Sequence, residues 1–218
     1  MSIESKLPDV GTTIFTVMSN LAAKHGAINL SQGFPDFDTP SALIELVAKH
    51  MHAGNNQYAP MQGVPALRER ISAKIADLYG CPANPETEIT VTSGATEALY
   101  AAITAVVRPG DEVIVMEPAF DSYVPAIRLN NGTPVFVPMT YPDFGIDWDR
   151  VNDAIGERTR LMILNSPHNP TGTVLSQMDI DALKQIVAGR DILIVSDEVY
   201  EHIVFDGLPH QSLLREPQ

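Results

Sequence analysis

The sequence predicts an α/β fold built on a mainly parallel sheet that carries helices on both faces. Two observations lead to this prediction. From residue 88 onward, short apolar runs alternate with segments of helical character, which is typical of consecutive βαβ units. The runs are also rich in β-branched residues, as strands are when a parallel sheet is buried on both faces. They are EITVTS (88–93), EVIVME (112–117), PVFVP (134–138), RLMILN (160–165) and DILIVSD (191–197).

Helices are expected before and between these strands. Through residues 64–80, apolar side chains recur at spacings of three or four, which indicates an amphipathic helix that Gly80 is suited to end. Another helix is expected at 41–53, after an irregular segment that covers residues 1 to about 40. The remaining helices are expected near 95–107, 121–130, 147–156 and 176–189.

The composition is that of an ordinary globular protein and argues against several classes of partner. Of the 218 residues, 44% are hydrophobic and 19% are charged, and the formal charge is −13. Because no basic cluster offsets that charge, nucleic acid is not expected as a partner. The single cysteine, Cys81, excludes an internal disulfide framework and fits a reducing compartment. With no apolar stretch typical of a signal peptide or a membrane span, we expect a cytoplasmic protein without a membrane partner.

Ligands of parallel sheets bind beyond the carboxyl ends of the strands, and the first informative strand end is TVTSGATEAL. Gly94 lets the backbone pass close to a ligand, and the free amides that open the next helix can hold an anion. Ala95 leaves room there, and Thr96 adds a hydroxyl group. A capped strand-to-helix turn would have the same sequence, so this motif alone leaves phosphate binding and a structural turn open.

The second strand end is LMILNSPHNPTG, residues 161–172. Two turns that contain Asn and two prolines predict a rigid loop. Asn169 in that loop can both donate and accept hydrogen bonds. The loop could equally be a tight turn that redirects the chain, and His168 is expected to be a solvated loop histidine.

The third strand end places Asp197 and Glu198 directly after a buried strand, with Tyr200 close behind. Such an acid can hold Mg²⁺ beside a nucleotide in a P-loop ATPase, but the required G-x-x-x-x-G-K-[ST] motif is absent. Asp197 could instead pair with a protonated ring nitrogen, while Tyr200 donates to an oxygen on the same ring. A cap for a following helix is the structural alternative.

Taken together, the three strand ends supply an anion cup, an amide, a counter-ion and a phenol at one edge of the sheet. Pyridoxal phosphate can use all four, since it carries a phosphate, a pyridine nitrogen and a phenolic oxygen. A carboxylate that keeps the ring nitrogen protonated preserves the capacity of the ring to accept electrons from a substrate carbanion. The sequence therefore predicts this cofactor and no metal.

The sequence also resembles the class I/II pyridoxal-phosphate aminotransferases of fold type I. The likeness is greatest to the bacterial methionine aminotransferases and the kynurenine/glutamine aminotransferases. It covers essentially the whole chain, through GTTIF, NLSQGFPDFDTP, NQYAPMQGVPALRE, TVTSGATEAL, GDEVIVMEPAFDSY, NSPHNPTG and VSDEVYEHI in this order.

The resemblance implies a role for each residue that matches a family motif. Gly33 would bring its backbone close to the substrate carboxylate, and Asn169 would contact both the ring oxygen and the substrate. Tyr58 would reach across to the phosphate in the partner subunit, so the active site would be shared within a homodimer. The cofactor-binding set it implies is Gly94, Ala95, Thr96, Phe120, Asn169, Asp197, Tyr200 and, from the partner, Tyr58.

The family also uses a Schiff-base lysine in an S-F-[GS]-K motif after a further strand. None of the lysines present stands in that context, so the catalytic lysine is expected beyond Gln218 and the 218 residues alone are expected to be inactive. By the same resemblance, 1–40 would be an N-terminal arm with part of a small domain, and 41–218 a partial large cofactor-binding domain. The five lysines are Lys6, Lys24, Lys49, Lys74 and Lys184.

The resemblance implies a transaminase that moves the amino group of methionine, or of another large apolar or aromatic amino acid, to a 2-oxo acid. Two other functions stay open. One is a C–S lyase of the cystathionine β-lyase type, which would use the same cofactor. The other is a non-catalytic remnant that kept the fold and lost the lysine.

Overall fold

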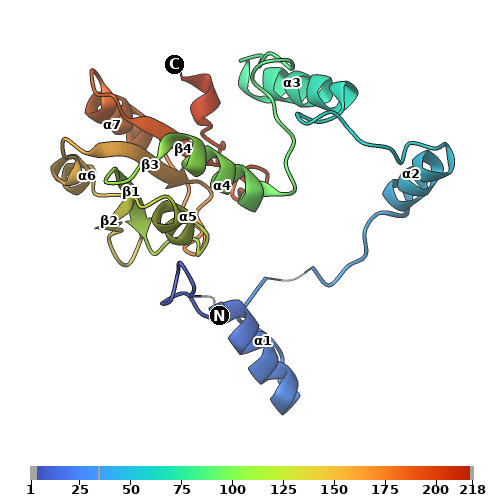
Figure 1. The fold of residues 1–218 in the computed structure, drawn as a ribbon, viewed down its shortest axis with the longest axis horizontal. Coiled ribbons are helices and arrows are strands. Elements are labelled where there is room, and N and C mark those ends of the chain that lie inside the picture. Colours follow the sequence, from blue (N-terminus) through green and yellow to red (C-terminus); the bar gives the residue numbers. More distant parts are fainter. Residues whose placement is uncertain (1–3, 34, 217–218) are drawn as a thin grey trace.

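The computed structural model describes residues 4–33 and 35–216, and its centre is a four-stranded parallel sheet in the order β2-β1-β3-β4 (Figure 1). Every neighbouring pair of strands in this sheet is parallel. The predicted fold class is therefore confirmed. The strands are β1 (Glu112–Glu117), β2 (Thr133–Pro138), β3 (Thr159–Asn165) and β4 (Leu193–Asp197).

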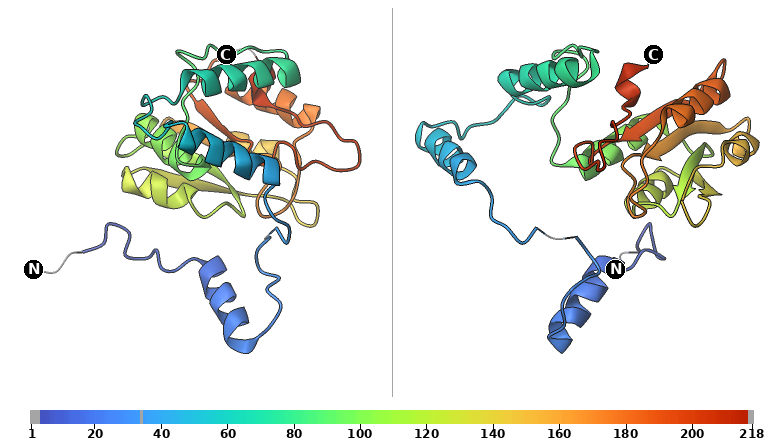
Figure 2. Two further views of the ribbon diagram at one scale, coloured as in Figure 1. Left: turned by 90° about the vertical axis from the view of Figure 1, so that its right-hand side faces the viewer. Right: turned by 180° about the vertical axis from the view of Figure 1, so that it is seen from behind.

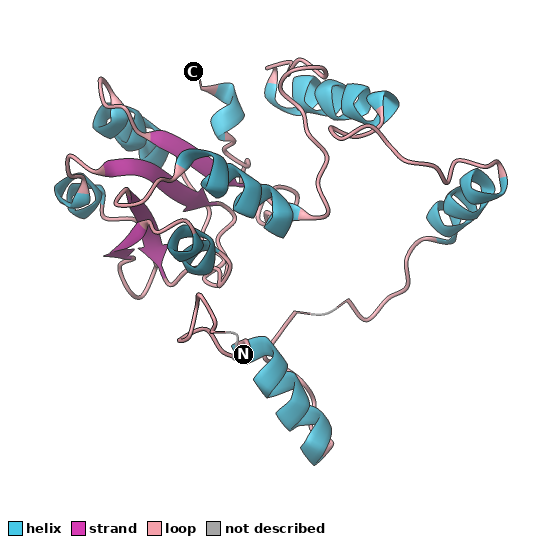
Figure 3. Ribbon diagram, viewed as in Figure 1, coloured by secondary structure: helices cyan, strands magenta, loops and turns pink. Residues whose placement is uncertain are grey.

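Helices cover both faces of the sheet, as Figure 3 shows. On one face, α4 (Ala95–Val106) and α5 (Tyr123–Leu129) pack against every second side chain of β1 and β3. The alternate side chains of these strands pack on the other face with α6 (Trp148–Ala154) and α7 (Gln177–Val187). Burial of each large apolar side chain in such a cluster contributes roughly 1.5–3 kcal/mol, and both faces of the central strands gain it. The first cluster includes Leu99, Ile103, Val113, Val115, Ile127, Leu161 and Ile163, and the second Ile114, Met116, Val151, Met162, Leu164 and Leu183.

The first part of the chain differs from the sequence prediction. Residues 1 to about 40 were expected to be irregular, but α1 (Ile14–His25) forms within them. Thr13 caps this helix by accepting a hydrogen bond from the amide of Thr16, and Gly26 ends it in the left-handed conformation with φ 61°. The Gly- and Pro-rich stretch that suggested irregular structure begins only after that helix has ended.

Two further helices precede the sheet. They are α2 (Ser41–His52) and α3 (Pro65–Tyr79), and Gly80 ends α3 with φ 73°, as expected. In Figure 1 and in the right-hand view of Figure 2, α1 and α2 stand apart from the sheet. No residue of α1 or α2 is buried, and most of their large apolar side chains are exposed. The short 3₁₀ helix Leu213–Arg215 follows the last strand.

The expected strand at 88–93 is wrong for the part of the chain that the structure describes. Ile89 is buried, so the apolar pattern identified a buried segment correctly. The segment nevertheless forms no strand, because the amide of Val91 donates to the carbonyl of Gln62 in a loop (2.9 Å) rather than to a neighbouring strand. A sheet ladder needs a partner strand, and local sequence does not report whether one is present.

Among the described residues, no helix combines the length and the apolar character needed to cross a membrane.

Candidate active site

Asp197 ends β4 at the carboxyl edge of the sheet, and its side chain is held by two donors. The residue is only 9% exposed. The hydroxyl of Tyr123 donates to Oδ2 at 2.7 Å, and the amide of Val199 donates to Oδ1 at 3.2 Å. Each carboxylate oxygen keeps a free lone pair for a further donor.

The structure contradicts one alternative for Asp197, that of a helix cap. The residues that follow it form turns rather than a helix, so it caps no helix. Within residues 4–33 and 35–216, no three His, Cys, Asp or Glu side chains gather in a way that could hold a metal ion. Asp197 is thus a buried acid with its carboxylate fixed and only partly satisfied.

Tyr123, the first residue of α5, is the part of the site that the sequence analysis missed. Its side chain is 3% exposed, and its ring lies edge-on to that of Phe120 with 5.7 Å between centroids. Burial, reinforced by the hydrogen bond to Asp197, raises the pKa of the Tyr123 hydroxyl well above its ordinary value. Tyr123 is therefore a neutral donor at any physiological pH. The only available signal was its position three residues after Phe120 in EPAFDSY, which is about one helical turn.

The predicted anion cup lies at the start of α4. Gly94 adopts φ 85°, a conformation that a side chain would strain, and open space surrounds the position where a Cβ would stand. No side chain caps the helix, so the amides of its first turn, which include those of Ala95 and Thr96, are available to a ligand. The C-terminal end of α4 is joined to the start of β1 by residues 107–111, so its first turn points toward the other edge of the sheet, where Asp197 lies.

Four of the predicted site residues line one cavity of about 1060 Å³. The cavity extends from the carboxyl edge of the sheet to α1 and the segment after it. It is also lined by apolar side chains from the arm and from the loop after β4, including Phe15, Pro35 and Ile203. The predicted residues in its wall are Gly33, Phe120, Asn169 and Tyr200.

The remaining predicted residues do not line this cavity. Gly94, Ala95, Thr96 and Asp197 are not part of its wall, and Tyr58 is fully exposed. The roles that the family resemblance implies for all these residues stay predictions.

In the loop after β3, His168 is buried rather than solvated as expected. The residue is 7% exposed, its Nδ1 lies 2.8 Å from the hydroxyl oxygen of Thr171, and the ring also contacts the backbone of Pro118. Burial lowers the pKa of His168, so its ring is neutral at pH 7. The loop folds back onto the end of β1 and encloses the ring, which the sequence of the loop alone did not indicate.

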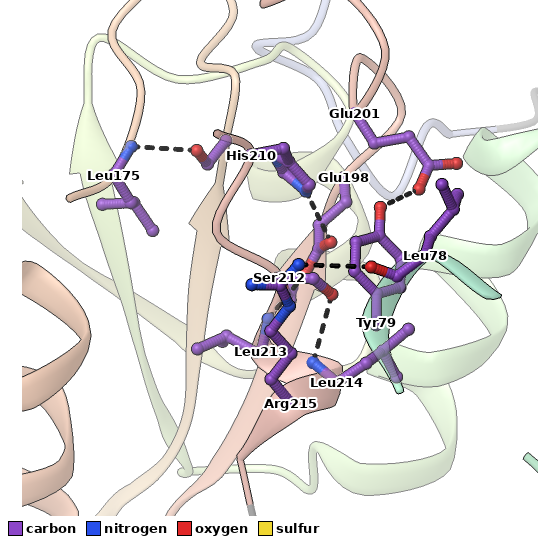
Figure 4. Close-up of polar contacts among 12 residues, drawn as sticks. Leu78, Tyr79, Leu175, Glu198, Glu201, His210, Ser212, Leu213, Leu214 and Arg215 are labelled. Carbon is purple, nitrogen blue, oxygen red and sulfur yellow. Dashed lines mark hydrogen bonds and ion pairs between the residues drawn. The ribbon is translucent and has the colours of Figure 1, made fainter. Parts of the chain in front are cut away.

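Glu198 has a structural role, and Figure 4 shows it in contact with His210. Its carboxylate lies 2.8 Å from Nε2 of His210 and accepts hydrogen bonds from the hydroxyl of Ser196 (2.7 Å) and the amide of Leu213 (3.1 Å). These contacts fasten the end of the described chain to β4. Nearby, Arg215 donates to the carbonyl of Leu78 at 3.2 Å and so joins the same segment to α3.

Comparison with known proteins decides the family. The family model for class I and II aminotransferases matches residues 25–216. The chain belongs to this family. The predicted resemblance is confirmed.

The proteins similar to this aminotransferase chain are named for different substrates. It is 57% identical over 215 residues to the methionine aminotransferase of Escherichia coli K12, covering 99% of this chain and 56% of the relative. It is 43% identical to a probable N-succinyldiaminopimelate aminotransferase of Mycobacterium tuberculosis, covering 96% of this chain and 53% of the relative.

A solved structure of an aminotransferase is also similar to this chain. The Escherichia coli protein YbdL, described as having a methionine aminotransferase function, superposes with a TM-score of 0.96 at 56% identity and covers all of this chain and 57% of its own. This aminotransferase chain thus spans about half the length of the curated relatives it matches.

Two lysines of the aminotransferase chain form ion pairs away from the cavity. Lys74 pairs with Glu201 and Lys184 with Glu216, and each lysine side chain is about half exposed. No lysine of the described residues lines the cavity that contains Phe120 and Tyr200.

Proposed function

We propose that the protein to which this chain belongs is a pyridoxal-phosphate-dependent aminotransferase. Its amino donor would be methionine or another large apolar or aromatic amino acid, and its acceptor a 2-oxo acid. The observation that carries the proposal is the buried carboxylate of Asp197, fixed at the end of β4 with capacity for one more donor on each oxygen.

The residues present fit the cofactor. An ionised acid that is costly to bury is stabilised by a cation, and a protonated pyridine nitrogen is such a cation. The uncapped first turn of α4 suits a phosphate, since free helix-start amides and the helix dipole favour an anion. Phe120 offers an aromatic face, and Tyr200 and Asn169 offer donors for a ring oxygen.

When bound, the cofactor supplies an electron-accepting ring for the charge that the substrate releases at its α-carbon. The residues of this chain would bind and orient it. Asp197 would hold the ring nitrogen protonated, and Phe120 would fix the plane of the ring by stacking. Asn169 and the backbone of Gly33 would position the substrate carboxylate. The apolar walls of the cavity, which include Phe15 and Ile203, favour a large apolar side chain on the substrate.

Proton transfer at the substrate α-carbon needs a base, which the family supplies as a lysine. The lysines seen in the structure lie away from the cavity. We therefore propose that the 218-residue chain binds the cofactor weakly and turns over no substrate by itself.

We also propose that the complete protein acts as a homodimer. The exposed apolar side chains of α1 and α2 and the exposed ring of Tyr58 support this proposal, because faces of this kind are usually covered by protein. A cytoplasmic location, and the division into an arm (1–40) and a partial large domain (41–218), stay predictions. The exposed large apolar side chains are Ile14, Val17, Met18 and Leu21 on α1 and Leu43, Ile44, Leu46, Val47 and Met51 on α2.

A substrate assay on the complete protein tests the function. The protein, loaded with pyridoxal phosphate, is given L-methionine and a 2-oxo acid, and the 2-oxo product of methionine is measured. We expect this product only when an acceptor is present. Release of pyruvate from cystathionine without any acceptor would instead favour the C–S lyase, and neither product would favour the non-catalytic remnant.

A further inference from the structure

The hydrogen bond between Tyr123 and Asp197 joins α5 to the end of β4 and is buried at both ends. The two residues are 74 positions apart in sequence, and both are less than 10% exposed. The bond joins two side chains, and one of them belongs to the acid on which the proposed function rests.

The bond completes the fixation of Asp197. Its backbone carbonyl accepts from the side chain of Asn165 (2.8 Å) and from the amide of Ser166 (3.0 Å). One carboxylate oxygen accepts from the amide of Val199. This bond alone would not fix the rotation of the carboxylate group about its Cβ–Cγ bond. The hydroxyl of Tyr123 occupies one position on the other carboxylate oxygen and so fixes the plane of the carboxylate.

The phenol of Tyr123 is a neutral donor to the carboxylate of Asp197. Tyr123 cannot take the charge itself, because its own pKa is raised and its proton stays on the phenol. The Asp197 oxygen thus receives its hydrogen bond from a donor that stays neutral.

We propose that Tyr123 is a positioning residue that holds the Asp197 carboxylate in place, aimed at the protonated ring nitrogen of the cofactor. This inference rests on the proposed function and extends it to a residue that does not touch the cavity wall. It predicts an effect specific to the ring nitrogen, which a bond that merely anchors α5 to the sheet would not produce.

The substitution Tyr123→Phe removes the hydroxyl and keeps the ring that packs on Phe120. In the complete protein, the dissociation constants of pyridoxal phosphate and of its analogue with carbon in place of the ring nitrogen are measured by absorbance titration. We expect Tyr123→Phe to weaken binding of pyridoxal phosphate by about tenfold, as for loss of a hydrogen bond to a charged group, and to leave the carbon analogue unaffected. Tyr141→Phe, at an exposed tyrosine, is the matched control and should change neither constant.

A double-mutant cycle tests the coupling directly. In an Asp197→Asn background the charge is gone, so adding Tyr123→Phe should cost no further affinity for pyridoxal phosphate. Equal weakening of both ligands by Tyr123→Phe, together with a lower Tm, would identify a structural anchor and overturn the inference, as would no effect on either ligand. If the unsubstituted protein itself binds both ligands equally, the proposed pairing of Asp197 fails, and that result is visible before any variant of Tyr123 is measured.

Discussion

Asn165 and Asp197 are paired at the ends of β3 and β4, where the side-chain amide of Asn165 donates to the carbonyl of Asp197 at 2.8 Å. The amide oxygen of Asn165 accepts from the backbone of Asn169 at 2.7 Å. One buried side chain thus connects the acid on β4 to the loop that carries Asn169. This connection explains how two residues from different strand ends can be held in a fixed relation.

The substitution Asn165→Ala should destabilise the protein by about 1–3 kcal/mol, because it leaves the part-buried amide of Asn169 without its acceptor and removes one of the two donors to the carbonyl of Asp197. Denaturant unfolding followed by circular dichroism measures this change. Asn152→Ala is the matched control, since Asn152 is exposed and its side chain accepts a hydrogen bond from Arg190, and it should cost less than about 0.5 kcal/mol. Equal effects of the two substitutions would contradict the connecting role of Asn165.

Neighbouring acids should respond differently to removal of their charge. Asp197→Asn should weaken binding of pyridoxal phosphate by at least about tenfold, since the pairing with a cation is lost. Glu198→Gln should lower the free energy of unfolding, because Glu198 holds the segment around His210 and Leu213, and should affect cofactor binding far less. Titration of the cofactor and thermal unfolding of both variants separate these effects. The reverse pattern would show that the two acids have been assigned the wrong roles.

The buried ring of His168 predicts a dependence of stability on pH. Burial lowers the pKa of His168 below 6.5, so between that lowered value and 6.5 the unfolded chain binds a proton that the folded chain does not. This contribution to stability is present above about pH 6.5 and is lost as the pH falls. Unfolding free energies measured from pH 7.5 to 5 should therefore fall less steeply in His168→Gln than in the unsubstituted protein. His52→Gln, at an exposed histidine, should leave the slope unchanged.

The start of α7 provides a test of local stability away from the site. The hydroxyl of Ser176 accepts from the amide of Asp179 at 3.3 Å, and the carboxylate of Asp179 accepts from the amide of Ser176 at 2.7 Å. Ser176→Ala should cost about 1 kcal/mol of stability and leave cofactor affinity unchanged. A loss of cofactor affinity in this variant would show that the site is less independent of α7 than the structure indicates.

The sequence predicted the elements that local pattern determines. Apolar runs predict the strands 112–117 and 160–165. Apolar spacing predicts the helix before Gly80, and a glycine there can adopt the positive φ that ends it. Helix α1 differs from the prediction although Ile14, Val17 and Leu21 have helical spacing, because the prolines and glycines after residue 31 are typical of irregular structure.

Features that depend on distant partners could not be predicted from local pattern. The segment 88–93 is buried but unpaired, since pairing depends on a strand elsewhere. The contact of Tyr123 with Asp197 and the enclosure of His168 both arise from the way the strand ends meet in space. The acid itself was identified because an ionisable residue after a buried strand is unusual whatever surrounds it.

A crystal structure of the complete protein with pyridoxal phosphate tests the central claim most directly. We expect the ring nitrogen within hydrogen-bonding distance of the Asp197 carboxylate and the phosphate on the amides of Ala95 and Thr96. A ring nitrogen that faces away from Asp197, or a phosphate bound at some other place, would contradict the proposed site.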